Sequence, residues 1–240
     1  MEYNRLVMKY KNLSEDEKNA ILIYKSRLSY CINEITSIPN FDSMTNSEIL
    51  KNIKDYDNFT RVYNEMKLIL DNPLNMLFKY GVFKNIDFTS ELNFISSILY
   101  VYKILNNINI VTSSNMTLYR IVSSSNPKFL SKGELVSTSL DVDNCEKFII
   151  DNMDITLYSI NLEPNSRVIV VPYSIKIDYL TNKLYIENDD DQKEVIFFKN
   201  DNDYNINSSK TKKYQNNKIE IIKMNAFSKK HKLTIWNIKY

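Results

Sequence analysis

The segment TSELNFISSILYVYKIL, residues 89–105, is the last long helical pattern in this chain. Its apolar residues recur every three or four positions, as on one face of an α-helix. From about Met116 the period changes, and short runs rich in β-branched and aromatic residues follow one another, as is typical of strands. Helices followed by strands indicate an α+β fold. We expect one domain over residues 1–240, mainly helical in 1–110 and strand-rich in 111–240.

Both parts can be divided further. A capping box formed by Ser14 and Glu17 starts a helical pattern that continues to Pro39, and helices are also expected over residues 46–56 and 59–71. A short helix is predicted for residues 141–151 and a loop for the polar residues 200–217. Strands are predicted at Val136, Leu157–Leu162, Val168–Val171, Leu184–Ile186, Val195–Phe198, Ile219–Ile222 and Leu233–Trp236.

Composition excludes several classes of function. The chain has 31 basic and 29 acidic side chains in 240 residues, so no strong positive field predicts nucleic-acid binding. No stretch approaches the roughly 20 apolar residues of a membrane span, and the start of the chain lacks a signal-peptide pattern. We therefore expect a protein that acts in the cytosol, either of the cell that makes it or of a host cell.

Few residues of the usual catalytic types are present. The two cysteines, Cys31 and Cys145, are expected to be buried and reduced, and they cannot form a metal site alone. The single histidine, His231, lies in a basic run near the C-terminus, which argues against a histidine-based triad. With only Gly81 and Gly133 in the chain, neither a P-loop nor a dinucleotide-binding glycine loop can be written.

Short polar motifs nevertheless follow one another in a distinctive order. They are LYR (118–120), STS (137–139) and QKE (192–194), the last leading into the apolar VIFF, and the segment LSEDEKNAIL (13–22) precedes them. Together with Tyr24 and Ile32-Asn33, these motifs resemble the Arg–Ser–Glu group of mono-ADP-ribosyltransferases, most of all the Rho-modifying clostridial-type exoenzymes. The resemblance implies an N-terminal helical layer on a mixed two-sheet core that binds NAD as a substrate, with no metal.

The resemblance also implies roles for particular residues. Glu194 is the catalytic carboxylate, because cleavage of the nicotinamide–ribose bond develops positive charge on the ribose. Ser137 is suited to orient this carboxylate through its hydroxyl. Arg120 offers a planar fork of donors to a phosphate or its ribose. The other residues that the resemblance assigns to NAD binding, besides Arg120 and Ser137, are Thr138, Asn33 and Phe148.

Gln192 separates classes of acceptor. Relatives that modify arginine have a glutamate at this position, whereas a glutamine supplies a neutral amide suited to an amide or hydroxyl acceptor. On an extended segment, Gln192 and Glu194 point to the same side, so Gln192 is expected to face the acceptor.

The chain also departs from the family pattern. An arginine expected shortly after Asn33 and another expected after Phe148 are both absent, and Lys25 and Lys147 are candidate substitutes. The acidic segment 187–191 stands where the relatives have an aromatic residue that recognises a GTPase, and it suits a basic patch on a protein substrate. We therefore expect a transferase acting on a protein, with a small GTPase as one candidate. An NAD glycohydrolase and a catalytically degenerate binding module remain as alternatives.

Overall fold

The chain forms helices first and strands afterwards, so the predicted α+β class is confirmed. The computed structural model describes residues 2–123, 135–143, 155–188, 193–198, 201–214 and 217–228. The helical elements are α1 (Glu2–Lys11), α2 (Glu15–Tyr24), α3 (Ser29–Thr36), η1 (Phe41–Ser43), α4 (Asn46–Asn52), α5 (Tyr56–Asp71), η2 (Pro73–Asn75), α6 (Met76–Tyr80) and α7 (Glu91–Asn107). The strands are β1 (Met116–Ser123), β2 (Leu135–Ser139), β3 (Ile155–Leu162), β4 (Val168–Val171), β5 (Tyr173–Asp178), β6 (Lys183–Asn188), β7 (Glu194–Phe198), β8 (Asn202–Tyr214) and β9 (Asn217–Ser228).

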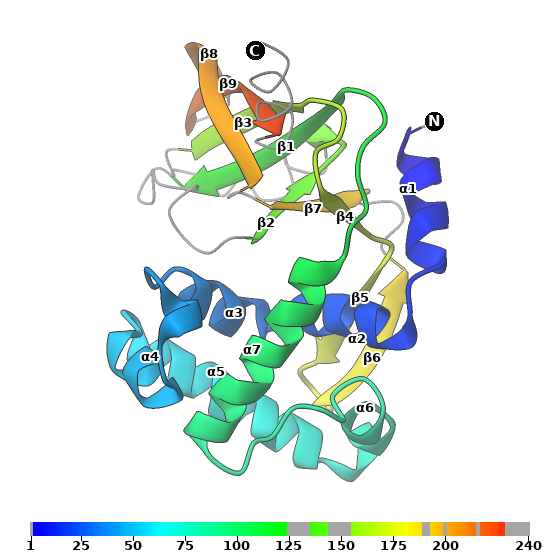
Figure 1. Ribbon diagram of the computed structural model, residues 1–240, viewed down its shortest axis with the longest axis vertical. Helices are drawn as coiled ribbons and strands as arrows, with labels where there is room; N and C mark the ends of the chain where they lie inside the picture. Colours follow the sequence, from blue (N-terminus) through cyan, green and yellow to red (C-terminus); the bar gives the residue numbers. More distant parts are fainter. Residues whose placement is uncertain are drawn as a thin grey trace, which may run out of the picture.

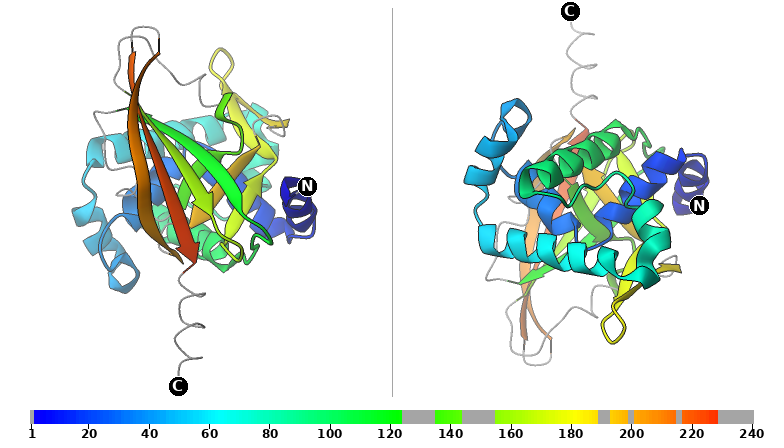
Figure 2. Two further views of the ribbon diagram at one scale, coloured as in Figure 1. Left: turned by 90° about the horizontal axis from the view of Figure 1, so that it is seen from above. Right: turned by 90° about the horizontal axis from the view of Figure 1, so that it is seen from below.

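These elements form a helical layer against a mixed sheet (Figure 1). The larger sheet has the strand order β4-β7-β2-β1-β3-β9-β8, and its neighbours are antiparallel except for the parallel pair β3 and β9. Strands β5 and β6 form a separate hairpin beside the helices. Seen from below, α2, α5 and α7 lie in front of the sheet (Figure 2). The chain therefore presents one face of its sheet to the helical layer.

One cluster of buried hydrophobic side chains joins the two layers. Phe94 and Ile98 of α7 belong to it together with Leu118 of β1 and Phe197 of β7. Every residue of β7 is buried, which means that both faces of this strand are covered. Cys31 also lies in this cluster as a buried free thiol, as expected, and burial raises its pKa well above the usual value. Cys145 lies outside the described residues.

The helix predicted to run from Ser14 to Pro39 is interrupted, and that part of the prediction is wrong. The capping box of Ser14 and Glu17 starts α2 as expected, but α2 ends at Tyr24. The hydroxyl of Ser26 donates to Ile23 O at 2.6 Å and accepts from Leu28 N at 3.2 Å. A serine that bonds its own backbone in this way competes with the helical ladder. The resulting turn leaves Lys25 as the C-cap residue of α2.

The loop predicted for residues 200–217 is also wrong, because β8 occupies most of it. Strand β8 pairs antiparallel with β9 along its length and forms one edge of the sheet. An edge strand has a neighbour on one side only, and polar residues are common there. Pairing with β9 therefore outweighs the polar composition from which we predicted a loop. The predicted strand at 233–236 and most of the predicted helix at 141–151 lie outside the described residues.

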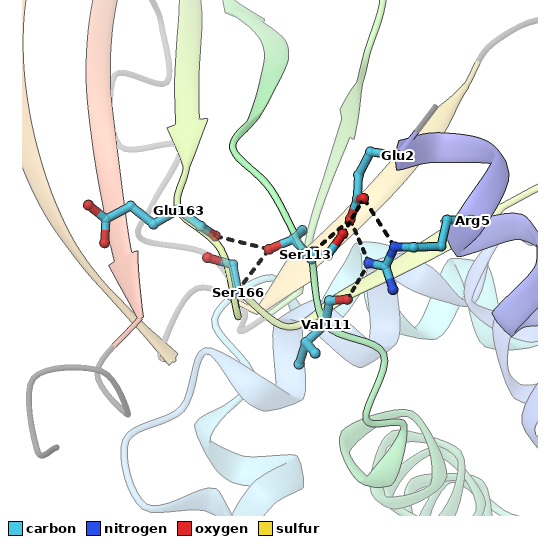
Figure 3. A network of polar contacts seen from close by, with 7 residues as sticks. Glu2, Arg5, Val111, Ser113, Glu163 and Ser166 are labelled. Carbon is cyan, nitrogen blue, oxygen red and sulfur yellow. Dashed lines mark hydrogen bonds and ion pairs between the residues drawn. The ribbon is translucent and has the colours of Figure 1, made fainter.

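Helix α1 was not predicted, and a polar network attaches it to the segment before β1 (Figure 3). Arg5 bonds the carboxylate of Glu2 and donates to Val111 O at 2.7 Å. Glu2 in turn accepts from the backbone and hydroxyl of Ser113 at 2.8 and 2.7 Å. The hydrogen bond from Arg5 is the main reason that the pKa of Glu2 falls to about 2.

Candidate functional site

Glu194 occupies the first position of β7, between the neighbouring strands β2 and β4. It pairs with Ser139 on one side and Val171 on the other, and it is one of the buried charged residues of the protein. Lys193, directly before it, has a left-handed φ of 44°. The Lys193 carbonyl accepts from Leu140 N at 3.2 Å. The chain thus turns sharply at Lys193, directly before β7 begins at Glu194.

Ser137 lies on β2 and reaches the same carboxylate. Ser137 pairs with Ile196, and Glu194 pairs with Ser139, so these four side chains share one face of the sheet. The hydroxyl of Ser137 donates a hydrogen bond to Glu194 Oε1. Because both residues sit on paired strands, the backbone fixes the relative position of hydroxyl and carboxylate.

Arg120 comes from β1, the next strand along the sheet. It pairs with Tyr158 of β3, and its Nη1 donates to the carbonyl oxygen of Ser137 at 2.5 Å. This contact draws the guanidinium to the strand that also carries the hydroxyl bound to Glu194. The arginine, serine and glutamate of the sequence motifs are therefore brought together by three neighbouring strands.

Lys25 approaches Glu194 from the helical layer. Its Nζ lies 2.5 Å from Glu194 Oε2, and the two side chains are 20% and 10% exposed. As the C-cap of α2, Lys25 also stands where the partial negative charge of the helix end favours a cation. The carboxylate of Glu194 consequently has a neutral donor on one oxygen and a cation on the other.

Tyr24 attaches the end of α2 to the sheet. Its hydroxyl donates to Leu135 O of β2 at 3.2 Å, and Asn33 Nδ2 donates to that hydroxyl at 3.5 Å. Complete burial is the main reason that the pKa of Tyr24 rises to about 12. Asn33 Oδ1 is buried without a hydrogen-bond partner. Asn33 thus has an acceptor that no described protein group satisfies.

Of the remaining predicted site residues, the structure describes only Thr138, and its side chain does not join this group. Thr138 is buried and its hydroxyl donates to Val195 O at 2.5 Å. It alternates with Ser137 along β2 and so faces the opposite side of the sheet, which gives it a contact between strands. Gln192 and Phe148 lie outside the described residues. The extended conformation expected across 192–194 is wrong at Lys193, whose left-handed φ breaks the two-residue alternation that related Gln192 to Glu194.

Among the described residues, neither a histidine nor a second carboxylate is seen paired with Glu194 as a general acid or base. The arrangement consists of one buried carboxylate held by a hydroxyl, with Arg120 and Lys25 supplying nearby positive charge. Such a carboxylate is suited to oppose positive charge that develops on a bound substrate. In the ranges that the structure covers, no cluster of His, Cys, Asp or Glu could hold a metal ion.

Sequence reasoning named Lys25 only as a substitute for a missing cation near NAD, and its ion pair with Glu194 was not foreseen. The spacing along the chain gives no signal for this contact, because the two residues come from different layers. Lys25 reaches the carboxylate from the C-cap position, directly after α2 ends at Tyr24. Ser26 is the one sequence signal that could have indicated this contact, because a serine that bonds the backbone can end a helix and leave Lys25 at its C-cap.

Several solved structures are similar to this chain. Plx2a, an ADP-ribosyltransferase toxin from Paenibacillus larvae, has a TM-score of 0.47 and 12% identity over 95% of this chain and 92% of that chain. An ADP-ribosyltransferase from Clostridium botulinum has a TM-score of 0.43 and 17% identity over 94% of this chain and 92% of that chain. BECa, an ADP-ribosylating toxin of a binary enterotoxin of C. perfringens solved with NADH, has a TM-score of 0.47 and 11% identity over 98% of this chain.

This chain spans 49% of the BECa chain, about half of its length. No protein-family model matches the sequence, and no curated protein sequence matches it.

Proposed function

We propose that this protein is an NAD-dependent mono-ADP-ribosyltransferase that modifies an asparagine, glutamine or hydroxyl side chain of another protein. The observation that carries the proposal is the contact between the Ser137 hydroxyl and the Glu194 carboxylate, with Arg120 bonded to the same strand. These are the residues that the motif order LYR, STS and QKE singles out in the sequence.

Glu194 supplies the main electrostatic contribution in this proposal. Loss of nicotinamide leaves positive charge on the ribose, as in glycoside cleavage, and a fixed carboxylate lowers the energy of that state. The site suits a cation, because the Lys25 ammonium already lies 2.5 Å from Glu194 Oε2. Ser137 orients the carboxylate, so that it does not reorganise during the reaction.

The residues around the carboxylate are suited to hold NAD. Arg120 presents a planar fork of donors, which matches phosphate geometry better than a lysine does. Asn33 Oδ1, buried and unpaired among the described residues, is available to accept from a hydroxyl or amide of the ligand. Phe148 is assigned to NAD binding on the sequence motif alone.

Gln192 is proposed to position the acceptor, on the sequence motif alone. Its amide is both a donor and an acceptor and carries no charge, which favours amide or hydroxyl acceptors over arginine. The acidic segment that precedes it suits a basic patch on the target protein, for which a small GTPase is one candidate. The target is proposed to lie in the cytosol, including that of a host cell. None of the helices described here is long and apolar enough to cross a bilayer.

Labelled NAD tests the proposed function directly. The purified protein is incubated with NAD labelled in its adenylate half, with and without cell lysate, and both labelled protein and free nicotinamide are measured. Label on a lysate protein supports the transferase. Nicotinamide release without labelled protein indicates a glycohydrolase, and the absence of both products indicates a binding module.

Variants of Gln192 test the acceptor assignment. Gln192→Ala is expected to abolish transfer to protein and to leave slow NAD hydrolysis largely intact, because water needs no positioning by the amide. Gln192→Glu is expected to admit arginine or free guanidines as acceptors. If transfer and hydrolysis fall in parallel in Gln192→Ala, the residue supports NAD binding or the fold, and the acceptor assignment is wrong.

A further inference from the structure

The Lys25–Glu194 ion pair joins the two layers of the molecule at the centre of the candidate site. Glu194 belongs to β7 of the sheet, and Lys25 caps α2 of the helical layer. The 2.5 Å distance between Nζ and Oε2 is a direct charge-assisted contact, and both side chains are largely removed from water. Of the two carboxylate oxygens, this is the one that Ser137 does not bond.

The position of the Lys25 ammonium conflicts with the proposed role of Glu194 in stabilising a ribose cation. A carboxylate that opposes a developing ribose cation must present its charge to that cation, and here a lysine already neutralises it. A bound dinucleotide therefore competes with Lys25 for Oε2. Once displaced, a partly buried ammonium needs another anion nearby, because an unpaired charge in such surroundings is costly.

The backbone of Lys25 is fixed by hydrogen bonds, whereas its side chain can rotate. The Lys25 N–H bonds Ile21 O at 2.9 Å, and the adjacent Tyr24 is bonded to Leu135 O of the sheet. The lysine stem has four carbons with rotatable bonds and ends in a compact point charge. Displacement thus moves the ammonium without moving α2. Arg27, the next cation along the chain, pairs with Glu65 and is committed elsewhere.

We propose that Lys25 is an exchangeable counter-ion, which pairs with Glu194 in the free protein and transfers to the diphosphate when the dinucleotide binds. This inference rests on the proposed NAD-dependent function. The dinucleotide carries a positive nicotinamide ring and a negative diphosphate, so it brings a replacement for each member of the Lys25–Glu194 pair. Binding then exchanges one ion pair for two, so a ligand with both charges displaces Lys25 from the carboxylate at a lower cost than a ligand with the cation alone.

Two fragments of the dinucleotide separate the parts of this exchange. ADP-ribose has the diphosphate without the nicotinamide cation, and nicotinamide riboside has the cation without phosphate. Lys25→Met is expected to weaken ADP-ribose binding by about tenfold, the usual value of one charge-assisted contact. The same variant is expected to bind nicotinamide riboside about threefold more tightly or better, because the ligand no longer displaces a cation from Glu194.

Affinities are measured by titration calorimetry or ligand-observed NMR on the full chain at one salt concentration. Lys79→Met is the matched control, since it makes the same substitution at a lysine of α6 that pairs with Asp71 away from the site. It is expected to leave both affinities unchanged. Lys25→Arg, which keeps the charge, is expected to retain most of the ADP-ribose affinity.

Opposite changes for the two fragments support the exchange, and a loss of packing cannot produce them. A parallel loss of both affinities in Lys25→Met makes Lys25 a structural residue and overturns the inference. An unchanged ADP-ribose affinity in that variant overturns the inference alone and leaves the proposed function standing. If the wild-type protein binds neither fragment and releases no nicotinamide from NAD, the proposed function fails and this inference fails with it.

Discussion

The helical and the strand-rich parts of the molecule use their polar residues differently. In the helices, polar side chains mostly complete the ends of elements, as the capping boxes of Ser14 with Glu17 and Thr45 with Glu48 do. In the sheet, polar side chains that are buried or partly buried bond each other across strands, as Ser137 and Glu194 do. The sheet therefore supplies the preorganised carboxylate, whereas the helical part supplies capping and packing together with the one cation, Lys25, that pairs with this carboxylate in the described residues. Changes in the two parts should consequently separate stability from ligand chemistry.

The largest expected effect is on stability and comes from the helical part. Phe94 of α7 is fully buried and contacts the rings of Phe59, Tyr63 and Phe88. Phe94→Ala is expected to lower the free energy of unfolding by about 3–5 kcal/mol, because it removes buried surface and leaves a cavity. Denaturant titration measures the loss. Leu77→Ala, at a site that is 89% exposed, is the control and should change stability by less than about 0.5 kcal/mol.

This first prediction also tests the division of labour between the parts. Well below its melting temperature, Phe94→Ala should bind ADP-ribose as the wild-type protein does, since the aromatic rings that Phe94 contacts all belong to the helical part of the chain. An affinity that falls with stability would show that the two parts are coupled through the core.

The next largest effect belongs to the sheet. Glu194→Gln keeps the shape of the side chain and its contact with Ser137 but removes the charge that opposes the ribose cation. The rate of nicotinamide release should fall by about 10²–10³-fold. The partly buried Lys25 ammonium loses its partner in this variant, so some loss of stability is expected too, and the rate is measured well below the melting temperature. Glu187→Gln, on the exposed strand β6, is the control and should release nicotinamide at the wild-type rate. A near-wild-type rate in Glu194→Gln would show that Glu194 has no catalytic role.

A smaller effect is expected on binding at the neighbouring strand. Arg120→Lys keeps the charge and loses the planar fork, so ADP-ribose should bind about tenfold more weakly. Titration calorimetry measures the change. Arg167→Lys is a matched control, because Arg167 stacks on Phe198 and pairs with Asp201. The control should cost stability and leave ADP-ribose affinity intact, and an equal affinity in Arg120→Lys would assign Arg120 a structural role.

The smallest effect concerns the attachment of α1. The folded-state pKa of Glu2 is about 2, below its ordinary value of 4.5, chiefly because of Arg5. The contribution of Glu2 is therefore fully present above about pH 4.5 and is lost as the pH falls towards about 2. Its size should be about 1 kcal/mol, because solvent still screens this partly buried pair.

Amide hydrogen exchange across residues 2–11 at pH 5 and pH 3 tests this sign. Protection of α1 should fall in the wild-type protein between these values and stay nearly constant in Glu2→Gln. Glu15→Gln, an exposed carboxylate in the first turn of α2, removes the same charge and should leave the fall unaltered. A fall of equal size in Glu2→Gln would show that another group controls the attachment.

Local sequence signals predicted those elements whose own residues determine them. The capping box at Ser14 and the continuous apolar run of β7 each identify an element without knowledge of its neighbours. Strand β8 could not be predicted in this way, because its polar sequence is held in a sheet by pairing with β9. The end of α2 could not be predicted either, because it depends on whether the Ser26 side chain bonds the backbone or the helix continues. The two alternatives are close in energy.

The candidate site follows the same division. The motif order brought Arg120, Ser137 and Glu194 into consideration, and adjacent strands do bring them together. Side chains alternate between the two faces along β2, so Thr138 lies on the face opposite Ser137. The motif STS by itself does not show which of its residues face the site. The pair of Lys25 with Glu194 depends on how two layers dock, and no local pattern encodes that.

The bond from Tyr24 to Leu135 O joins residues 111 positions apart, and it holds the end of α2 on the sheet. Contacts between such distant residues form late in folding, because the chain loses the entropy of a large loop before it gains their energy. Helical circular dichroism should therefore recover early during refolding, while affinity for ADP-ribose returns only with the final docking of the layers. The rate at which ADP-ribose binding recovers would then measure the docking of the layers, a folding step that circular dichroism of the helices does not detect.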